Sequence, residues 1–380
     1  MKIVVAPQNF KGSLSAPEAA RAMAEGVRRV LPDAEVVVVP MADGGDGTVE
    51  AMVEATGGRI MATEVTGPLG GKVTAKWGML GDGVTGVLEM AAASGLTLMP
   101  PDRLNPLVAT TYGTGEMIRA ALDAGCRRLL IGIGGSGTND GGAGMAQALG
   151  VRLQDSNGEE LPRGGAALAK LERVDISGLD ERLKGCSVEA AYDVNNPLLG
   201  EKGASMVYGS QKGATEEMCR QLDGALAHYA GIIRDTLGVD VAYLPGAGAA
   251  GGLGAGLAAF LGAKLLPGME IVSRAVGLEE RLKGASLVLT GEGRIDGQTL
   301  FGKVVAGVAS RAKALGIPVV AIVGEIADGD EVYGQGIDAV LSIAPGPISL
   351  DRALADAGSL VADAAERAMR LIMIRLDKYV

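Results

Sequence analysis

The sequence predicts an α/β protein in which a parallel-sheet domain is interrupted by a second, mixed α/β domain. The chain has 380 residues, which is long for a single hydrophobic core. Strand and amphipathic-helix patterns alternate near both ends of the chain, as in parallel α/β sheets. Between them lies a stretch with the pattern of antiparallel strands. We therefore predict a first domain at 1–64 and 286–380, and an inserted domain at 65–285.

The amino-terminal part of the chain alternates between strand and helix. Short apolar runs predict buried strands, and apolar residues at helical spacing predict the helices that cover them. Ser15 and Glu18 have the spacing of a capping box, which marks a helix start. In order, we predict a strand at Lys2 to Val5, a helix from Ser15 to Pro32, a strand at Glu35 to Val39, a glycine-rich turn at Ala42 to Thr48, and a helix to Ala55.

The pattern changes near Val65. Lys72 to Leu80 and Val84 to Met90 have strand composition and are joined by a Gly-Asp-Gly turn, so we predict that they pair antiparallel. The other elements predicted for this domain are a helix at Thr114 to Ala124, a strand at Arg128 to Ile133, a helix at Met145 to Leu149, a strand at Ser187 to Tyr192, and a helix at Glu216 to Leu237.

The first pattern returns near Ser286. We predict strands at Ser286 to Leu289, Pro318 to Val323 and Ala339 to Ile343, with helices from Gly302 and from Ser349. With the two amino-terminal strands, these would form one flavodoxin-like parallel sheet in the order 2-1-3-4-5. Ligands of such sheets bind beyond the carboxyl ends of the strands, at the switch point between the first and third strands.

Composition excludes several classes of protein. The formal net charge is −10 and no basic stripe is visible, which argues against nucleic-acid binding. The single histidine, His228, is interpreted as an ordinary helix residue. One histidine and three dispersed cysteines are too few and too far apart for a Cys/His zinc site, so a bound metal would be a hard ion such as Mg²⁺.

The same counts bear on location. Dispersed cysteines of odd number fit a reducing cytoplasm, and the amino-terminus has no signal-peptide pattern. The uncharged stretch Val241 to Ala263 consists mostly of Gly and Ala, so we predict a buried, closely packed helix instead of a membrane span. Oligomeric state is left open, and a homo-oligomer is possible.

The stretch Ile131 to Gly144, IGIGGSGTNDGGAG, is the most distinctive of the chain. A strand that leads through a glycine turn into a helix exposes N–H groups that favour an anion such as phosphate. Asp140 within it is either a metal ligand beside that phosphate or the cap of the following helix. Candidate nucleotide contacts here are Gly134, Gly135, Ser136 and Asn139.

Three further turns follow strands of the parallel sheet: Lys11 to Ser13, Asp43 to Asp46, and Glu292 to Asp296. We expect them to meet at one edge of the sheet, with Asp193 added by the inserted domain. Phosphoryl transfer needs cations and metal-holding carboxylates to neutralise the phosphoryl group, and a carboxylate base to accept a proton. The candidates are Asp193 as the base, Lys11 and Arg294 as catalytic cations, contacts at Ser13, Gly44, Gly45, Lys212, Gly291, Gly293 and Lys303, and metal ligands at Asp43, Asp46, Glu292 and Asp296 beside Asp140.

Two other functions remain open at this point. Gly132 to Gly137 matches the G-x-G-x-x-G pattern, with Asp155 downstream, which would suit an NAD-dependent dehydrogenase of a small hydroxy acid. Gly246 to Gly251 matches the same pattern, so the pattern alone is not specific. A non-catalytic, two-domain small-molecule binding protein is the third possibility.

Eight motifs, in order along nearly the whole chain, resemble those of the bacterial-type glycerate kinases. They are Phe10 to Ser15, Ala42 to Thr48, Thr111 to Glu116, Gly132 to Gly144, Asp193 to Leu198, Gln211 to Ala214, Pro245 to Gly254, and Thr290 to Thr299. The family pattern usually has Asp-Ser at Gln8-Asn9, Asp at Asn195 and Pro at Ser210.

The resemblance implies ATP- and Mg²⁺-dependent phosphorylation of a D-glycerate hydroxyl by a two-domain enzyme. We expect glycerate to bind between the domains with its carboxylate near Lys11 or Arg294, while Asp193 activates a hydroxyl. The sequence does not decide between the 2- and the 3-hydroxyl.

Overall fold

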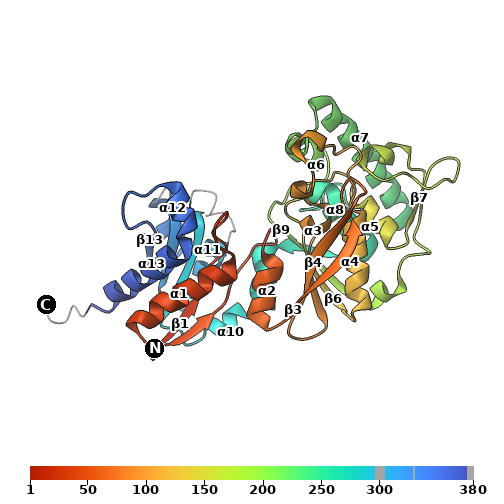
Figure 1. The fold of residues 1–380 in the computed structure, drawn as a ribbon. Helices are drawn as coiled ribbons and strands as arrows, with labels where there is room; N and C mark the ends of the chain where they lie inside the picture. The colour runs from red at the N-terminus through yellow and green to blue at the C-terminus, as the bar shows by residue number, and fades with distance from the viewer. Residues whose placement is uncertain (296–303, 328–329, 375–380) are drawn as a thin grey trace. The chain divides into compact units, whose positions relative to one another are not determined.

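The computed structural model describes residues 1–295, 304–327 and 330–374, and the chain forms two compact units (Figure 1). The first unit comprises Met1–Asp43, Glu50–Thr56 and Val272–Val380, and the second comprises Gly44–Val49 and Gly57–Ile271. The helix α2 (Thr48–Thr56) contributes residues to both units, as does α9 (Gly268–Ala275).

The first unit contains a five-stranded parallel sheet. The spatial order is β2-β1-β11-β12-β13, which is the predicted flavodoxin-like order 2-1-3-4-5, so the predicted fold class is confirmed. The strands are β1 (Lys2–Val5), β2 (Glu35–Val38), β11 (Leu287–Ile295), β12 (Val319–Ile326) and β13 (Ala339–Ser342).

Helices cover this sheet and complete its core. The capping box is present at the start of α1 (Ala16–Val30), because Ser15 Oγ accepts a hydrogen bond from Glu18 N–H and the Glu18 carboxylate accepts one from Ser15 N–H. Met23 and Val27 of α1 are buried against the sheet. The remaining helices are α10 (Leu278–Leu282), α11 (Val304–Ala314), α12 (Leu350–Ala355) and α13 (Ala357–Ile372), with the 3₁₀ helix η7 (Asp330–Gln335).

The predicted turn from Glu292 to Asp296 is wrong as far as Ile295, because the residues from Thr290 to Ile295 continue β11. Gly291 pairs with Ile322, and Arg294 pairs with Glu325, in parallel register with β12. A Cβ atom on Gly291 would lie 1.9 Å from the carbonyl oxygen of Ile322, so glycine here permits close strand packing and does not mark a turn. Asp296 and Lys303 lie outside the described residues.

The second unit is built on a six-stranded mixed sheet in the order β10-β9-β6-β5-β4-β3. The pairs β3–β4 and β4–β5 are antiparallel, as predicted for the latter, and the other neighbours are parallel. The sequence did not predict β3, β7, β8 or β10. The strands are β3 (Arg59–Thr66), β4 (Lys72–Met79), β5 (Thr85–Glu89), β6 (Arg128–Gly132), β9 (Ser187–Tyr192) and β10 (Lys264–Pro267), with a separate antiparallel pair β7 (Arg152–Gln154) and β8 (Arg173–Asp175).

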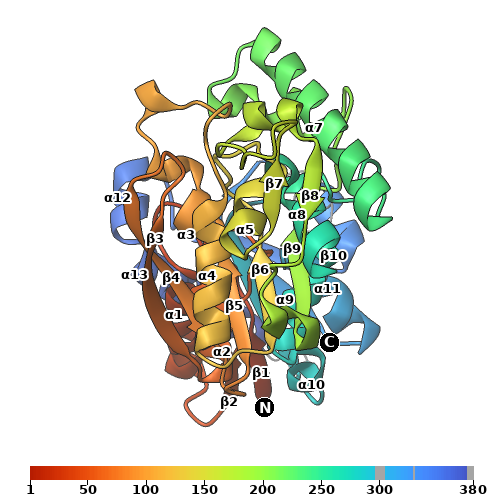
Figure 2. The ribbon, with the colours of Figure 1, turned by 90° about the vertical axis from the view of Figure 1, so that its right-hand side faces the viewer.

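Helices of the second unit pack on this sheet. Figure 2 shows α4 (Tyr112–Asp123) in front of the strands, where it packs on β3, β4 and β5 and lies beside α5 (Ala143–Ala148). The remaining helices are α3 (Ala91–Ser94), α6 (Ala204–Tyr208), α7 (Glu216–Leu237) and α8 (Leu253–Leu261), and the 3₁₀ helices are η1 (Leu96–Leu98), η2 (Pro101–Arg103), η3 (Gly165–Lys170), η4 (Glu181–Gly185), η5 (Ser210–Lys212) and η6 (Ala249–Gly252).

Two sequence interpretations concern helices of this unit. His228 lies in α7, and its Nε2 is 2.6 Å from the carbonyl oxygen of Leu171, as suits an ordinary helix residue. The glycine-rich stretch Val241 to Ala263 contains η6 and α8, whose Leu253 and Leu257 are fully buried. Within the described residues, no helix is both long enough and apolar enough to span a bilayer.

Candidate active site

Two glycine turns of the second unit pack backbone against backbone. A Cβ atom on Gly132 would lie 2.3 Å from the carbonyl oxygen of Gly44, and one on Gly134 would lie 3.1 Å from the Cα atom of Gly45. Gly44 also has a left-handed φ of +95°. These glycines therefore allow the turn before α2 to touch the turn after β6. The role of Gly44 and Gly45 as ligand contacts stays a prediction.

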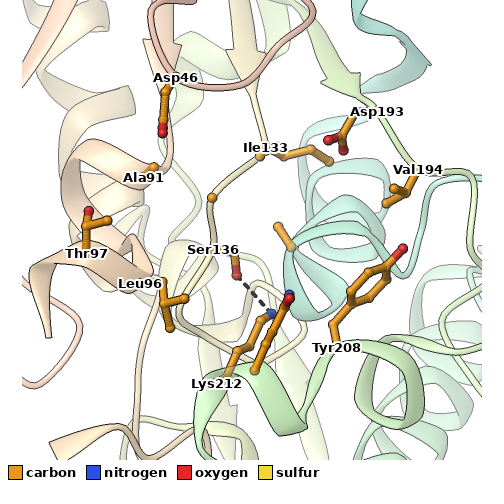
Figure 3. A pocket seen from close by; sticks show the side chains of 14 residues that line it. Asp46, Ala91, Leu96, Thr97, Ile133, Ser136, Asp193, Val194, Tyr208 and Lys212 are labelled. Carbon is orange, nitrogen blue, oxygen red and sulfur yellow. Dashed lines mark hydrogen bonds between the residues drawn. The ribbon is translucent and has the colours of Figure 1, made fainter. Parts of the chain in front are cut away.

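A pocket of about 280 Å³ opens beside this junction, entirely within the second unit (Figure 3). One wall is the backbone of Gly134, Gly135 and Ser136, so these predicted contacts do line a cavity. In the view of Figure 3, Asp193 lies above the pocket and Lys212 below it. The other lining residues are Asp46, Ala91, Leu96, Thr97, Ile133, Val194, Tyr208, Gln211 and Ala250.

Lys212 is the most unusual residue of the pocket because its side chain is only 2% exposed. Its Nζ donates hydrogen bonds to the carbonyl oxygen of Thr138 at 2.7 Å and to Ser136 Oγ at 3.2 Å. Burial lowers the pKa of Lys212 to about 7, although the negative charge of Asp140 acts in the opposite direction. A buried amine with two neutral acceptors can bind an anion that enters the pocket.

Asp193 follows β9 directly and is exposed to the pocket. Tyr208, the last residue of α6, lines the pocket beside it and donates a hydrogen bond to Asn196 Oδ1 at 2.8 Å. Burial raises the pKa of Tyr208, and the charge of Asp193 raises it further, so the phenol stays protonated. The carboxylate of Asp193 is exposed and also lines the pocket, and its role as the base stays a prediction.

Sequence reasoning missed Tyr208 and Ala250. Tyr208 stands four residues before Lys212, a spacing that places both on one side of a helical segment and was available in the sequence. Ala250 has a φ of 56° and, of the residues that the structure describes, is the one non-glycine residue with a positive φ. No sequence signal marks that conformation.

Asp46 lies close to the glycine turn of the pocket. A Cβ atom on Gly135, which has a φ of +71°, would stand 3.4 Å from Asp46 Oδ1. Asp46 is exposed and, like Asp193, lines the pocket. Its carboxylate therefore faces the pocket beside this glycine turn.

Asp140 accepts hydrogen bonds from the start of α5, whose N-cap residue is Gly142, and this position favours a capping role over metal binding. It is fully buried, and its carboxylate accepts hydrogen bonds from Thr111 N–H and Oγ1–H, Gly142 N–H and Gly144 N–H. Burial raises the pKa of Asp140, and these hydrogen bonds act in the opposite direction. The helix N-terminus predicted to bind phosphate is thus satisfied by the protein itself.

Asn139 also has a role within the fold. Its side chain is fully buried, and Nδ2 donates to Ser205 Oγ of α6 at 2.9 Å. It does not line the pocket. A direct nucleotide contact by Asn139 is therefore not supported by its position.

In the first unit, several predicted residues lie together at the carboxyl ends of β1 and β11. Gln8 donates from its side chain to Asp43 Oδ2 at 3.0 Å and from its backbone to the carbonyl oxygen of Gly291 at 2.8 Å. A Cβ atom on Gly293 would lie 3.2 Å from the backbone nitrogen of Lys11. Asp43, Lys11 and the Gly291–Gly293 segment that contains Glu292 thus share one edge of the sheet.

Three other residues predicted for the site, Glu292, Arg294 and Ser13, also lie in this unit. Glu292 is 8% exposed, whereas Arg294 is exposed and forms an ion pair with Glu325 at 3.4 Å. Ser13 Oγ donates to the carbonyl oxygen of Phe10 and so stabilises the turn that carries Lys11.

Among the residues that the structure describes, no three carboxylates, cysteines or histidines lie close enough together to hold a metal ion by themselves. Mg²⁺ in phosphoryl-transfer sites is usually held by one or two carboxylates together with the phosphates of the substrate. The exposed carboxylate of Asp46 beside the glycine turn fits that mode of binding.

The flavodoxin-like sheet of the first unit and the lysine-lined pocket of the second fit the class of α/β enzymes that act on small anionic substrates. A family model described as the glycerate kinase family matches residues 3–373, and the chain belongs to this family. It is therefore a kinase. The dehydrogenase and the binding protein that the sequence left open find no support in these comparisons.

Individual relatives of known sequence or structure are similar to this chain over almost its whole length. The glycerate kinase of Halalkalibacterium halodurans is 53% identical over 364 residues, which are 96% of each chain. The glycerate 2-kinase of Escherichia coli is 55% identical over 354 residues, 93% of each chain. The crystal structure of a protein described as glycerate kinase 2 from Salmonella typhimurium LT2 is 53% identical, covers 98% of each chain and has a TM-score of 0.91.

Proposed function

We propose that this protein transfers the γ-phosphoryl group of ATP to a hydroxyl of D-glycerate. The observation that carries the proposal is the family match over residues 3–373, together with two curated relatives above 50% identity that are named for this activity. In the reaction, the substrate oxygen forms a bond to the γ-phosphorus, the bond from that phosphorus to the ADP oxygen breaks, and the hydroxyl proton leaves to a base.

Asp193 is the base in this proposal. Its carboxylate is exposed in the pocket, and a base must reach the attacking hydroxyl within hydrogen-bond distance. Lys212 and the backbone of Gly134 to Ser136 line the same pocket and supply positive charge and N–H dipoles for a bound anion. These roles are consistent with phosphoryl transfer, in which positioning and charge neutralisation provide most of the catalysis.

Asp46 is the residue of the second unit that best fits a magnesium ligand. Its carboxylate is exposed and lies beside Gly135. Mg²⁺ bound there would neutralise negative charge on the phosphoryl oxygens. Asp43 and Glu292, at the sheet edge of the first unit, are the further candidates that the sequence predicted.

Lys11 supplies the cation of the first unit in this proposal. It is exposed in the turn after β1, at the sheet edge where ligands of flavodoxin-like sheets bind. Arg294 is the weaker candidate, because it is already paired with Glu325. The binding of glycerate between the two domains stays a prediction. We also propose a cytoplasmic location, since the cysteines of the chain are free.

The 2-hydroxyl is the acceptor we propose, because the Escherichia coli relative, 55% identical, is named a glycerate 2-kinase. The test is a coupled assay of ADP release with D-glycerate, ATP and Mg²⁺, followed by phosphorus NMR of the product. We expect glycerate-dependent ADP release and 2-phosphoglycerate. Absence of glycerate-dependent turnover would refute the activity, and 3-phosphoglycerate would refute the choice of hydroxyl.

A further inference from the structure

The pocket of the second unit presents one buried cation and two exposed carboxylates to a ligand. Lys212 is the cation, and Asp46 and Asp193 are the carboxylates. Within the described part of the chain, Lys212 forms no ion pair, and its hydrogen-bond acceptors are a carbonyl and a hydroxyl. An ammonium group has three donors, so one donor remains for a ligand in the pocket that Lys212 lines.

Asp140 does not neutralise Lys212 in place of a ligand. It influences Lys212 through space, but its oxygens accept hydrogen bonds from Thr111, Gly142 and Gly144. A buried cation without a carboxylate in contact is unfavourable unless an anion binds to it. The pocket is therefore matched to a ligand that brings one negative charge to Lys212.

The distribution of charge favours a hydroxy acid over a nucleotide at this point. A ligand with a carboxylate at one end and a hydroxyl at the other places the carboxylate on Lys212 and the hydroxyl near Asp193, which Figure 3 shows across the pocket. A triphosphate would instead bring several negative charges to Lys212, the one cationic side chain among the residues that line this pocket. The volume of about 280 Å³ is also below that of most pockets for larger ligands.

We propose that Lys212 binds the carboxylate of the substrate and so makes the enzyme select hydroxy acids over neutral polyols. This inference rests on the proposed function, since it assigns the carboxylate of glycerate to Lys212 and not to Lys11 or Arg294. Gln211, beside Lys212, carries no charge, and Tyr208 remains a neutral hydrogen-bonding group.

A consequence is that glycerate binding takes up a proton above neutral pH. Burial lowers the pKa of Lys212 to about 7, and a bound carboxylate favours the charged amine. At pH 8 the free enzyme would hold roughly 0.1 proton on Lys212, so binding takes up about 0.9 proton there and about 0.1 at pH 6. Of the acidic groups that face the pocket or act on Lys212, Asp46 and Asp193 are exposed, whereas Asp140 is enclosed by its hydrogen bonds.

The test is isothermal titration calorimetry of the full chain with D-glycerate alone, at pH 6 and pH 8, in two buffers of different ionisation enthalpy. We expect proton uptake at pH 8 in the wild type. In Lys212→Met we expect no proton uptake and affinity for glycerate that is lower by about 100-fold or more. Lys170→Met, which removes an exposed lysine of η3, is the matched control and should behave as the wild type.

The neutral analogue D-glyceramide separates recognition of the carboxylate from a general effect on the pocket. The wild type should prefer glycerate to glyceramide by a large factor, and Lys212→Met should lose that preference. Unchanged glycerate affinity in a folded Lys212→Met variant, or a wild type that binds glyceramide as tightly as glycerate, would overturn the inference. Loss of ATP affinity alone would assign Lys212 to the nucleotide and would overturn it equally. Failure of the wild type to phosphorylate glycerate would instead refute the proposed function.

Discussion

Replacement of Asp140 by Asn distinguishes a helix cap from a metal ligand. In the structure, Asp140 Oδ2 accepts hydrogen bonds from Thr111 N–H at 2.8 Å and Gly144 N–H at 3.3 Å, and Oδ1 accepts one from Gly142 N–H at 3.1 Å. An amide keeps only one oxygen. Whichever way it is oriented, its NH₂ group faces at least one backbone N–H, which is then left buried without an acceptor.

The loss of stability can be estimated from the number of backbone N–H groups that lose their acceptor. A buried donor left without an acceptor costs about 1–3 kcal/mol, and the remaining hydrogen bonds lose the contribution of the charge. Removal of a buried charge offsets part of this loss. We expect Asp140→Asn to lower the free energy of unfolding by roughly 2–3 kcal/mol, which corresponds to a Tm lower by about 4–12 °C for a unit of this size.

The assay pairs thermal unfolding, followed by circular dichroism, with the Mg²⁺ dependence of the kinase reaction. Asp140→Asn should lower Tm and leave the Mg²⁺ concentration for half-maximal rate unchanged. Asp46→Asn is the matched comparison: its side chain is exposed, so Tm should change little while the Mg²⁺ requirement rises. An Asp140→Asn enzyme with normal Tm and a raised Mg²⁺ requirement would refute the capping role.

Three further predictions concern the pocket and its supporting turns. Burial lowers the pKa of Lys212 to about 7 from an ordinary 10.5, so between these pH values the unfolded chain binds the extra proton. The free energy of unfolding of the wild type relative to Lys212→Met should therefore rise with pH over this window, by at most about 5 kcal/mol, and be lowest below pH 7. Urea unfolding of both proteins at pH 6, 8 and 10 measures this difference. A difference that does not change with pH would contradict the prediction. Asp193→Asn should reduce kcat by ~10² or more if Asp193 is the base, and near-normal steady-state turnover would remove it from that role. Gly132→Ala places a Cβ atom 2.3 Å from the carbonyl oxygen of Gly44 and should lower Tm. Gly185→Ala, with open space around it, should not lower Tm. Equal Tm values in the two variants would show that the contact between Gly132 and Gly44 can adjust to the added methyl group.

The strand order of the first unit was predictable because its signals are local. Each strand is a short apolar run, and the Ser15–Glu18 capping box marks the following helix by residue types three positions apart. The continuation of β11 beyond Leu289 was not predictable in the same way. Gly291 and Gly293 are typical of turns, and only the neighbouring Ile322 and Lys11 backbones reveal that both glycines serve close packing.

Several residues that line the pocket were predicted from the sequence, but their surroundings were not. Asp140 has the residue type and the surroundings of a metal ligand, yet its main partner is Thr111, which lies 29 residues away and carries no pattern that links the two. Lys212 was predicted to be a substrate contact from its place between Gln211 and Gly213. Its burial depends on Thr138 and Ser136, more than 70 residues earlier, so the altered pKa could not be foreseen.

Gly251 links the unusual glycine content of the chain to the chemistry of the pocket. It does not line the pocket, but it has a φ of +65°, and a Cβ atom on it would lie 2.0 Å from the carbonyl oxygen of Thr138. That oxygen is the closer acceptor of Lys212 Nζ, at 2.7 Å. The carbonyl oxygen of Gly251 also accepts a hydrogen bond from Gly141 N–H at 3.0 Å, so the two backbones are held together.

Gly251→Ala should therefore displace the Thr138 carbonyl and disturb Lys212 from outside the pocket. We expect a higher KM for glycerate and a changed proton uptake on glycerate binding, because the amine loses its acceptor and its pKa moves. The strained φ should also lower Tm, since an L-residue in this region costs about 1–2 kcal/mol. Gly231→Ala, in α7 with nothing within 4 Å, is the control and should leave the KM for glycerate and the proton uptake unchanged. A Gly251→Ala enzyme with lower Tm but normal KM and proton uptake would show that the position of Lys212 does not depend on this glycine.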